Sequence, residues 1–350
     1  MPKPTHRNKE RVTVQTIADQ AGVSIAAVSS VLNNRHVERR ISPETVTTIR
    51  AVAAQLGYLP NISARRLRSG TSQKNNLVLA FVTSYEAPLS LANHLIMELR
   101  QLVGSQGKGM RDLTFSVMVE MFSAGQLKDM PGLLTGDHFN AAIITNTTPE
   151  DDQFLARSDL PFPVVLVNRA IPRYSCVVED PEAGRLVGGA LLQGRRRHPA
   201  VLHGTPLTQS TRNRVDSFVR AVTRQLGHPP QEIVAASLSE SAAYDAMIRF
   251  LGSGGRLDAL YAVTDSMALG AYHAIKEKRL KIPKDITVVG VGDYDISAFF
   301  DPPLSVVGVQ RSELGKEASR LLLRQLEQPG LPPLKVEIPV QCVLRASTGL

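Results

Sequence analysis

Basic side chains are concentrated at one end of this chain. Within residues 1–75, twelve lysines and arginines stand against four acidic residues, which leaves a local excess of eight positive charges. The whole chain also carries a formal charge of +8, so residues 76–350 are balanced. Groups that neutralise phosphates, gathered in one segment, predict a polyanionic partner. The twelve bases are Lys3, Arg7, Lys9, Arg11, Arg35, Arg39, Arg40, Arg50, Arg65, Arg66, Arg68 and Lys74.

Patterns typical of catalysis, nucleotide binding or metal binding are missing from the sequence. Gly290–Gly292 lacks the third glycine of a dinucleotide-binding turn, and the glycines at 104–109 do not have P-loop spacing. The eight histidines are dispersed, and none are paired at the helical spacing of zinc ligands. We therefore expect a protein that is not an enzyme, with no catalytic residue, no cofactor and no metal.

Length and composition set the class of protein. A chain of 350 residues is long enough for two or three domains with full hydrophobic cores. The N-terminus has no apolar signal segment, and the longest apolar runs are strand-sized. The two cysteines, Cys176 and Cys342, argue against a disulfide scaffold. These features predict a cytoplasmic protein without a membrane span.

Residues 13–33 have the pattern of two short helices joined by a tight turn. Thr13 can cap the first helix, Gly22 can adopt the positive φ of the turn, and Ser24 can cap the second helix. This pattern predicts a helix-turn-helix whose second helix enters a major groove of DNA. A helical hairpin without a DNA role is the alternative, and the basic excess disfavours it. The residues left on the outer face of the second helix are Ile25, Ala26, Ser29, Ser30 and Asn33.

A third helix and a short basic segment follow. Ser42, Pro43 and Glu44 give a cap, an N1 proline and a first-turn acid, and Gly57 can end the helix. Residues 61–70 read NISARRLRSG, in which one leucine lies among arginines. Such a leucine suits a wedge between base steps in the minor groove. A solvated linker with an incidental leucine is the alternative.

From residue 77 onward, strand and helix patterns alternate. Apolar strands with helical crossovers predict parallel sheets that are covered by helices on both faces. The run is too long for one sheet, so we expect two α/β lobes with a ligand cleft between them. The strands expected are Leu77–Val82, Thr114–Val119, Ala141–Thr145, Val164–Asn168, Val201–His203, Ala259–Val263, Thr287–Val291 and Ser305–Val309.

The stretch VTVQTIADQAGVSIAAVSSVLN, followed by GYLPNISARRL, resembles the headpiece and hinge of the LacI/GalR family of bacterial transcription factors. The resemblance implies a homodimer that reads two half-sites of a double-stranded operator, with hinge helices that form on the operator and a leucine that kinks its centre. The DNA-binding residues assigned on this basis are Thr13, Ser24, Ile25, Ala26, Ala27, Ser29, Ser30, Asn33, Asn61, Ala64, Arg65 and Leu67.

One departure from the family pattern bears on how DNA is read. Many members carry Thr-Val-Ser-Arg where this chain has residues 27–30 as Ala-Val-Ser-Ser. An arginine pairs bidentately with guanine, a contact worth about 1–3 kcal/mol of discrimination. Without it, we expect contacts with thymine methyls and recognition that depends partly on the shape of the operator.

Later blocks of the chain, among them VVLVNR, RNRVDSFVRAV and IPKDITVVGVGDYD, resemble the periplasmic-binding-protein-like effector domain of the same family. By position, Arg214 matches an arginine that grips ligand hydroxyls or carboxylates, although an arginine on a surface helix is the alternative. The ligand positions at two further strand ends are altered in this chain, which leaves open whether a sugar or any ligand binds. The effector-binding residues assigned are Arg214, Thr264, Asp265, Gly292 and Asp293.

These observations predict an all-α helix-turn-helix headpiece (1–60), a hinge helix and linker (61–75) and a two-lobed α/β effector domain (76–350). The first lobe is expected at about 76–170 and 308–330, and the second at about 171–307 and 331–350. The function expected is sequence-specific transcriptional regulation, most simply repression, modulated by an unknown small-molecule effector. The alternatives are a solute-binding receptor and an effector domain that has lost ligand sensing.

Overall fold

The computed structural model describes residues 13–32, 36, 39–56, 76–87, 90–105, 114–130, 132–134, 136, 138–192, 196–292, 295–309, 311–328 and 330–349. The chain divides into two compact units, Met1–Lys74 and Asn75–Leu350. The predicted hinge at 61–75 lies outside the described residues.

The described residues of the first unit form three helices: α1 (Val14–Ala21), α2 (Ile25–Leu32) and α3 (Pro43–Gln55). They pack around one small apolar core, because each helix turns a stripe of aliphatic side chains inward. The buried members of this core are Ile17, Ala18, Val28, Val31, Val46, Ile49 and Ala53. The predicted all-α headpiece is therefore present.

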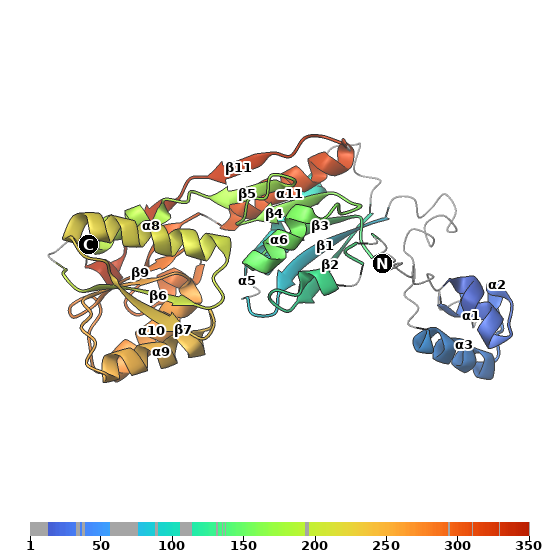
Figure 1. The fold of residues 1–350 in the computed structure, drawn as a ribbon, viewed down its shortest axis with the longest axis horizontal. Helices are drawn as coiled ribbons and strands as arrows, with labels where there is room; N and C mark the ends of the chain where they lie inside the picture. The colour runs from blue at the N-terminus through green and yellow to red at the C-terminus, as the bar shows by residue number, and fades with distance from the viewer. Residues whose placement is uncertain are drawn as a thin grey trace, which may run out of the picture. The chain divides into compact units, whose positions relative to one another are not determined.

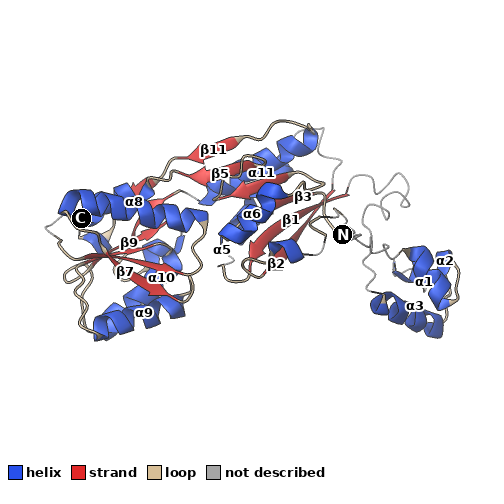
Figure 2. Cartoon of the chain, viewed as in Figure 1, coloured by secondary structure: helices blue, strands red, loops and turns tan. Residues whose placement is uncertain are grey.

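The second unit is built on two six-stranded sheets (Figures 1 and 2). The first has the order β11-β5-β4-β3-β1-β2, and the second has the order β12-β10-β9-β8-β6-β7. Every strand pair is parallel except β10 with β12. The strands are β1 (Asn76–Ser84), β2 (Thr114–Phe122), β3 (Ala141–Ile144), β4 (Val164–Val167), β5 (Ser175–Glu179), β6 (Pro199–Gly204), β7 (Gln231–Ala235), β8 (Ala259–Ala262), β9 (Thr287–Val291), β10 (Ser305–Gly308), β11 (Lys335–Ile338) and β12 (Gln341–Val343).

Helices cover both faces of each sheet, as parallel strands require. Around the first sheet, leucines of α5 and α11 fill the core on one face, and Leu155 of α6 lies in the core on the other. Around the second sheet, α7 packs on α8, and α9 packs on α10. The helices are α5 (Ser90–Ser105), α6 (Pro149–Arg157), α7 (Ala183–Leu191), α8 (Gln209–Leu226), α9 (Glu240–Gly252), α10 (Asp265–Glu277) and α11 (Arg311–Glu327), with short 3₁₀ turns η1 (Leu127–Asp129), η2 (Asp295–Phe299) and η3 (Ala346–Thr348).

The lobe boundaries differ from the predicted ranges in two places. Strand β5 and strand β11 both pair in the first sheet, although residues 171–182 and 331–338 were expected in the second lobe. The chain therefore crosses between lobes after β5, after β10 and after β11. Because β5 extends the first sheet beyond β4, its last residue, Glu179, lies next to the segment that crosses to the second lobe.

Candidate functional site

The turn between α1 and α2 is fixed by local hydrogen bonds. Thr13 accepts from the amide of Thr16 (3.2 Å), and the Thr16 hydroxyl accepts from the amide of Thr13 (3.2 Å), so the two form a capping box. Gly22 ends α1 with φ of +65°, a conformation that favours glycine. Ser24 then accepts from the amide of Ala27 (3.2 Å) at the start of α2. This geometry sets the angle at which α2 leaves the core.

The outward side of α2 is apolar and hydroxyl-bearing. Ser24, Ile25 and Ala26 are exposed, whereas Ala27, Ser29 and Ser30 are half-buried. The Ser30 hydroxyl donates to the carbonyl of Ala26 (2.7 Å), which directs it to its own helix. Thr13 is exposed at the start of α1. The other residues assigned to DNA binding, Asn33, Asn61, Ala64, Arg65 and Leu67, lie outside the described residues.

In the second unit, the carboxyl ends of strands from the two sheets meet. The amide of Ala170, which follows β4, donates to the side-chain oxygen of Gln209 at the start of α8 (2.7 Å). Arg214 of α8 is bonded both to Glu179 at the end of β5 and to the carbonyl of Val263 after β8. Parallel sheets bind ligands at such edges, so this is the candidate effector site.

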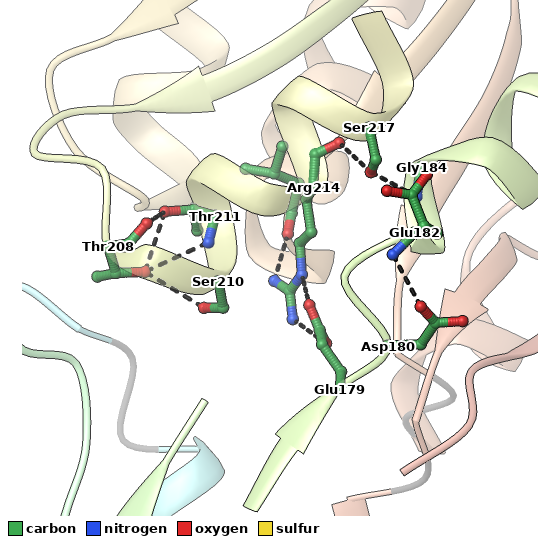
Figure 3. Close-up of polar contacts among 10 residues, drawn as sticks. Glu179, Asp180, Glu182, Gly184, Thr208, Ser210, Thr211, Arg214 and Ser217 are labelled. Carbon is green, nitrogen blue, oxygen red and sulfur yellow. Dashed lines mark hydrogen bonds and ion pairs between the residues drawn. The ribbon is translucent and has the colours of Figure 1, made fainter. Parts of the chain in front are cut away.

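Arg214 is occupied by protein groups (Figure 3). Its Nε and Nη2 donate to the two carboxylate oxygens of Glu179, at 2.5 and 2.7 Å, and its Nη1 donates to the carbonyl of Val263 at 2.9 Å. The residue is 8% exposed. The alternative of a surface arginine therefore does not hold, and the carboxylate of Glu179 is a partner that the sequence pattern did not suggest.

The other assigned effector residues lie at neighbouring strand ends. Thr264 caps α10 by accepting from the amide of Met267 (3.2 Å), and Asp265 is buried beside it. Gly292 follows β9 with φ of +82°, and its amide nitrogen is 2.6 Å from where a Cβ on Gly308 would lie. The positive φ accounts for glycine at position 292, and the close approach accounts for glycine at position 308. Asp293 lies outside the described residues.

Sequence reasoning missed a polar cluster at the edge of the first sheet. Arg169, which follows β4, is 1% exposed, and its Nη1 donates to the hydroxyl of Thr147 (2.6 Å). Its Nε and Nη2 are buried and have no hydrogen-bond partner. Burial lowers the pKa of Arg169 to about 10, opposed by the charges of Asp152 and Asp151. A lone arginine after a buried apolar strand was the available signal.

Backbone strain marks the same edge. Asn146 and Asn168, which follow the neighbouring strands β3 and β4, have φ of +58° and +62°. Asn146 donates to the hydroxyl of Thr83 (2.9 Å), and the side-chain oxygen of Asn168 is buried without a partner. Left-handed residues of this kind cluster at binding sites. Near them, burial raises the pKa of Asp152, against the opposing effects of Arg169 and of a short hydrogen bond from Thr147.

The described part of the chain has neither a metal-binding cluster nor a membrane-spanning helix. Within it, no group of three or more histidine, cysteine, aspartate or glutamate side chains is placed to hold a metal ion. None of the helices described there is long and apolar enough to cross a membrane.

Comparison with known proteins finds a family model for part of each unit. Residues 13–61 match the model of bacterial regulatory proteins of the lacI family, and residues 189–348 match that of a periplasmic binding protein-like domain. The chain is 26% identical over 340 residues to the HTH-type transcriptional repressor PurR of Mannheimia succiniciproducens, covering 96% of this chain and 98% of the relative. It is 27% identical over 318 residues to the HTH-type transcriptional regulator GalS of Salmonella typhimurium, covering 89% of each.

Both kinds of unit are also found together in a solved structure. The lac repressor dimer bound to operator and the anti-inducer ONPF is 24% identical and superposes with a TM-score of 0.67, over 97% of this chain and 99% of that one. This likeness covers the helical headpiece and the two-lobed domain, so the predicted fold class is confirmed. The chain is a DNA-binding transcriptional regulator that combines a lacI-family helix-turn-helix domain with a periplasmic binding protein-like domain.

Proposed function

We propose that this regulator represses transcription by binding operator DNA as a homodimer, and that a small molecule held between its two lobes changes operator affinity. The observation that carries the proposal is the capped turn that presents Ser24, Ile25 and Ala26 of α2 outward from the headpiece core. A helix that is held in this way against α1 and α3 can enter a major groove of DNA. The junction of the two α/β lobes in the same chain would provide a second site, for the effector.

On DNA, the outer side of α2 supplies methyl groups and hydroxyls. Ile25 and Ala26 suit contact with thymine methyls, and Ser24 and Thr13 suit hydrogen bonds to phosphate. Arg39 and Arg40 are exposed before α3 and would add phosphate contacts, which strengthen binding without selecting a sequence. Operator choice then depends on few direct base contacts and on DNA shape.

In the cleft, the effector would be held by Thr264, Asp265, Gly292 and Asp293 from the second lobe and by Asn168 and Arg169 from the first. The unpartnered nitrogens of Arg169 and the unpartnered oxygen of Asn168 support this assignment, because buried polar groups without partners are costly unless a ligand or water bonds to them. Effector contacts with both lobes would link lobe closure to operator affinity.

A direct test combines operator selection with ligand screening. Selection from random duplexes should enrich a two-half-site sequence, and binding to it should weaken steeply with salt as counterions are released. A metabolite library would then be screened by thermal shift, and each hit retested for altered operator affinity and for binding to Arg169→Met. Binding of selected and random duplexes with equal affinity would contradict the proposal.

The dimer should depend on an apolar patch of the second lobe. Phe299 is 84% exposed on η2, with Ile296 exposed on the same turn. Leu269 is exposed on α10, which is tied to η2 by the edge-on contact of Tyr272 with Phe300 at 5.0 Å. Exposed apolar side chains on adjoining elements are typical of protein–protein contacts. Phe299→Glu should raise the dimer dissociation constant by about 30-fold or more, measured by sedimentation.

A matched control separates this effect from a general effect of added charge. Leu334 is also exposed, but it precedes the edge strand β11 of the first sheet. Leu334→Glu should leave the dimer dissociation constant within about threefold of the original, a change of less than about 1 kcal/mol. If both variants raised the dimer dissociation constant equally, the exposed apolar residues of η2 would not be part of the dimer interface.

A further inference from the structure

We propose that Glu179 is an internal ligand of Arg214, filling the place that an acidic group of an effector would take, so that the effector is uncharged at this end of the cleft. The inference rests on the proposed effector site and adds to it the chemical class of ligand that the Arg214 end excludes. Glu179 thereby becomes a specificity-determining residue.

The geometry of the pair is that of a carboxylate ligand on a guanidinium (Figure 3). Both oxygens of Glu179 are used, each by a different nitrogen on the same edge of the Arg214 fork, at 2.5 and 2.7 Å. Such paired bonds are the strongest and most directional that arginine makes. A ligand carboxylate that bound this edge would have to displace Glu179, and Nη1 on the other edge is already bonded to the carbonyl of Val263.

Burial makes that displacement costly. Glu179 is 6% exposed and Arg214 is 8% exposed. Behind them, the rings of Phe218 and Tyr261 lie 5.1 Å apart and are fully buried. The Tyr261 hydroxyl is buried without a hydrogen-bond partner. When an ion pair is buried away from water, removing one partner leaves an uncompensated charge, which is strongly unfavourable.

The segment that links β5 to α7, residues 180–182, holds Glu179 in position. Asp180 accepts from the amide of Glu182 (2.8 Å), and the Ser217 hydroxyl of α8 accepts from the amide of Gly184 at the start of α7 (3.0 Å). A Cβ on Gly184 would lie 2.3 Å from the amide nitrogen of Phe218. The absence of a side chain at Gly184 thus lets α7 lie directly against α8 and keeps the strand end beside Arg214.

The pair also joins the two lobes. Glu179 ends a strand of the first sheet, and Arg214 and Val263 belong to the second lobe. A carboxylate that links the lobes is a contact that a bound acidic effector would otherwise supply. In this chain a carboxylate of the protein itself makes the contact and balances the charge of Arg214.

The test replaces Glu179 by alanine and returns the missing group as acetate. Alanine removes one methylene and the carboxylate, which acetate matches in shape and charge. The full chain of Glu179→Ala should melt about 6–20 °C below the original protein. Acetate should then raise its melting temperature more than acetamide or chloride does at equal concentration. The original protein should respond equally to all three.

The matched control is Glu182→Ala on the same crossover. Glu182 pairs with Arg220 at 2.7 Å, and both side chains are about half exposed (50% and 56%), so solvent screens this pair. This variant should show no preference for acetate. If Glu179→Ala fails to fold, its refolding yield is compared in acetate and in acetamide, and acetate should give the higher yield.

Two results would overturn the proposal. One is an equal effect of acetate and acetamide on Glu179→Ala, in melting or in refolding yield. The other is stabilisation of the original protein by acetate beyond chloride, because that would show Arg214 still open to acids. Operator mobility shifts on the same samples keep the proposals apart, since a failure to bind any selected duplex counts only against the proposed function.

Discussion

Operator affinity should fall by roughly 30- to 10,000-fold when Ile25 is replaced by aspartate. Ile25 is 45% exposed at the first position of α2, where the proposed function puts it against base edges. A carboxylate there loses the apolar contact and repels the flanking phosphates. The cost of a spoiled contact is about 1–3 kcal/mol at each half-site, and a dimer has two. Mobility shift with a selected operator measures the change.

The control for Ile25→Asp carries the same charge on another helix of the headpiece. Ala51 is exposed on α3, and Ala51→Asp changes the net charge of the headpiece equally. Both variants should keep the helical content and melting behaviour of the original protein, since neither side chain lies in the core. If the two variants lose the same affinity, general repulsion explains the loss, and α2 is not the reading surface.

Local rules of the sequence were enough to predict the headpiece. The caps at Thr13 and Ser24 and the left-handed turn at Gly22 each depend on neighbours within four residues, and all three are present. The inward stripes follow from helical periodicity, so the core could also be predicted. The hinge segment is different, because its expected structure depends on DNA and it lies outside the described residues.

In the effector domain, strands could be predicted from the sequence where they coincide with apolar runs. The eight strands expected from apolar runs are all present. The four strands not expected are β5, β7, β11 and β12, and the last three are partly exposed. Strand β7 begins with Gln231 and Glu232, which face solvent at a sheet edge, so its pattern resembles a loop. Strand β11 pairs with β5, more than 150 residues earlier, which no local pattern can indicate.

The effector site shows the same limit more sharply. Arg214 could be assigned by position within a resembling segment, but its partner Glu179 lies 35 residues away on the other lobe. The motif gives the residue that could bind a ligand, and only the fold shows what already binds it. Arg169 was missed for a related reason, because its importance comes from burial and from nitrogens without partners, which no spacing of residues encodes.

A second large effect should follow from removing one side chain of the headpiece core. Ile49 is fully buried among the three helices, and Ile49→Ala should cost about 2–5 kcal/mol. A core in a unit of fewer than about 70–80 residues rarely supplies more than about 3–5 kcal/mol, so most headpieces should unfold. Operator binding should then be lost at room temperature, while the melting transition of Asn75–Leu350 stays unchanged.

Calorimetry and mobility shift together decide this expectation. The neighbouring Thr48 is exposed on the same helix and donates only to the carbonyl of Glu44 (2.9 Å), so Thr48→Ala should keep both operator binding and headpiece stability. If Ile49→Ala binds operator as the original protein does, the headpiece draws stability from outside its own core, for example from the operator itself. Raising the operator concentration tests that explanation, because a ligand that binds only the folded headpiece restores folding in proportion to its concentration.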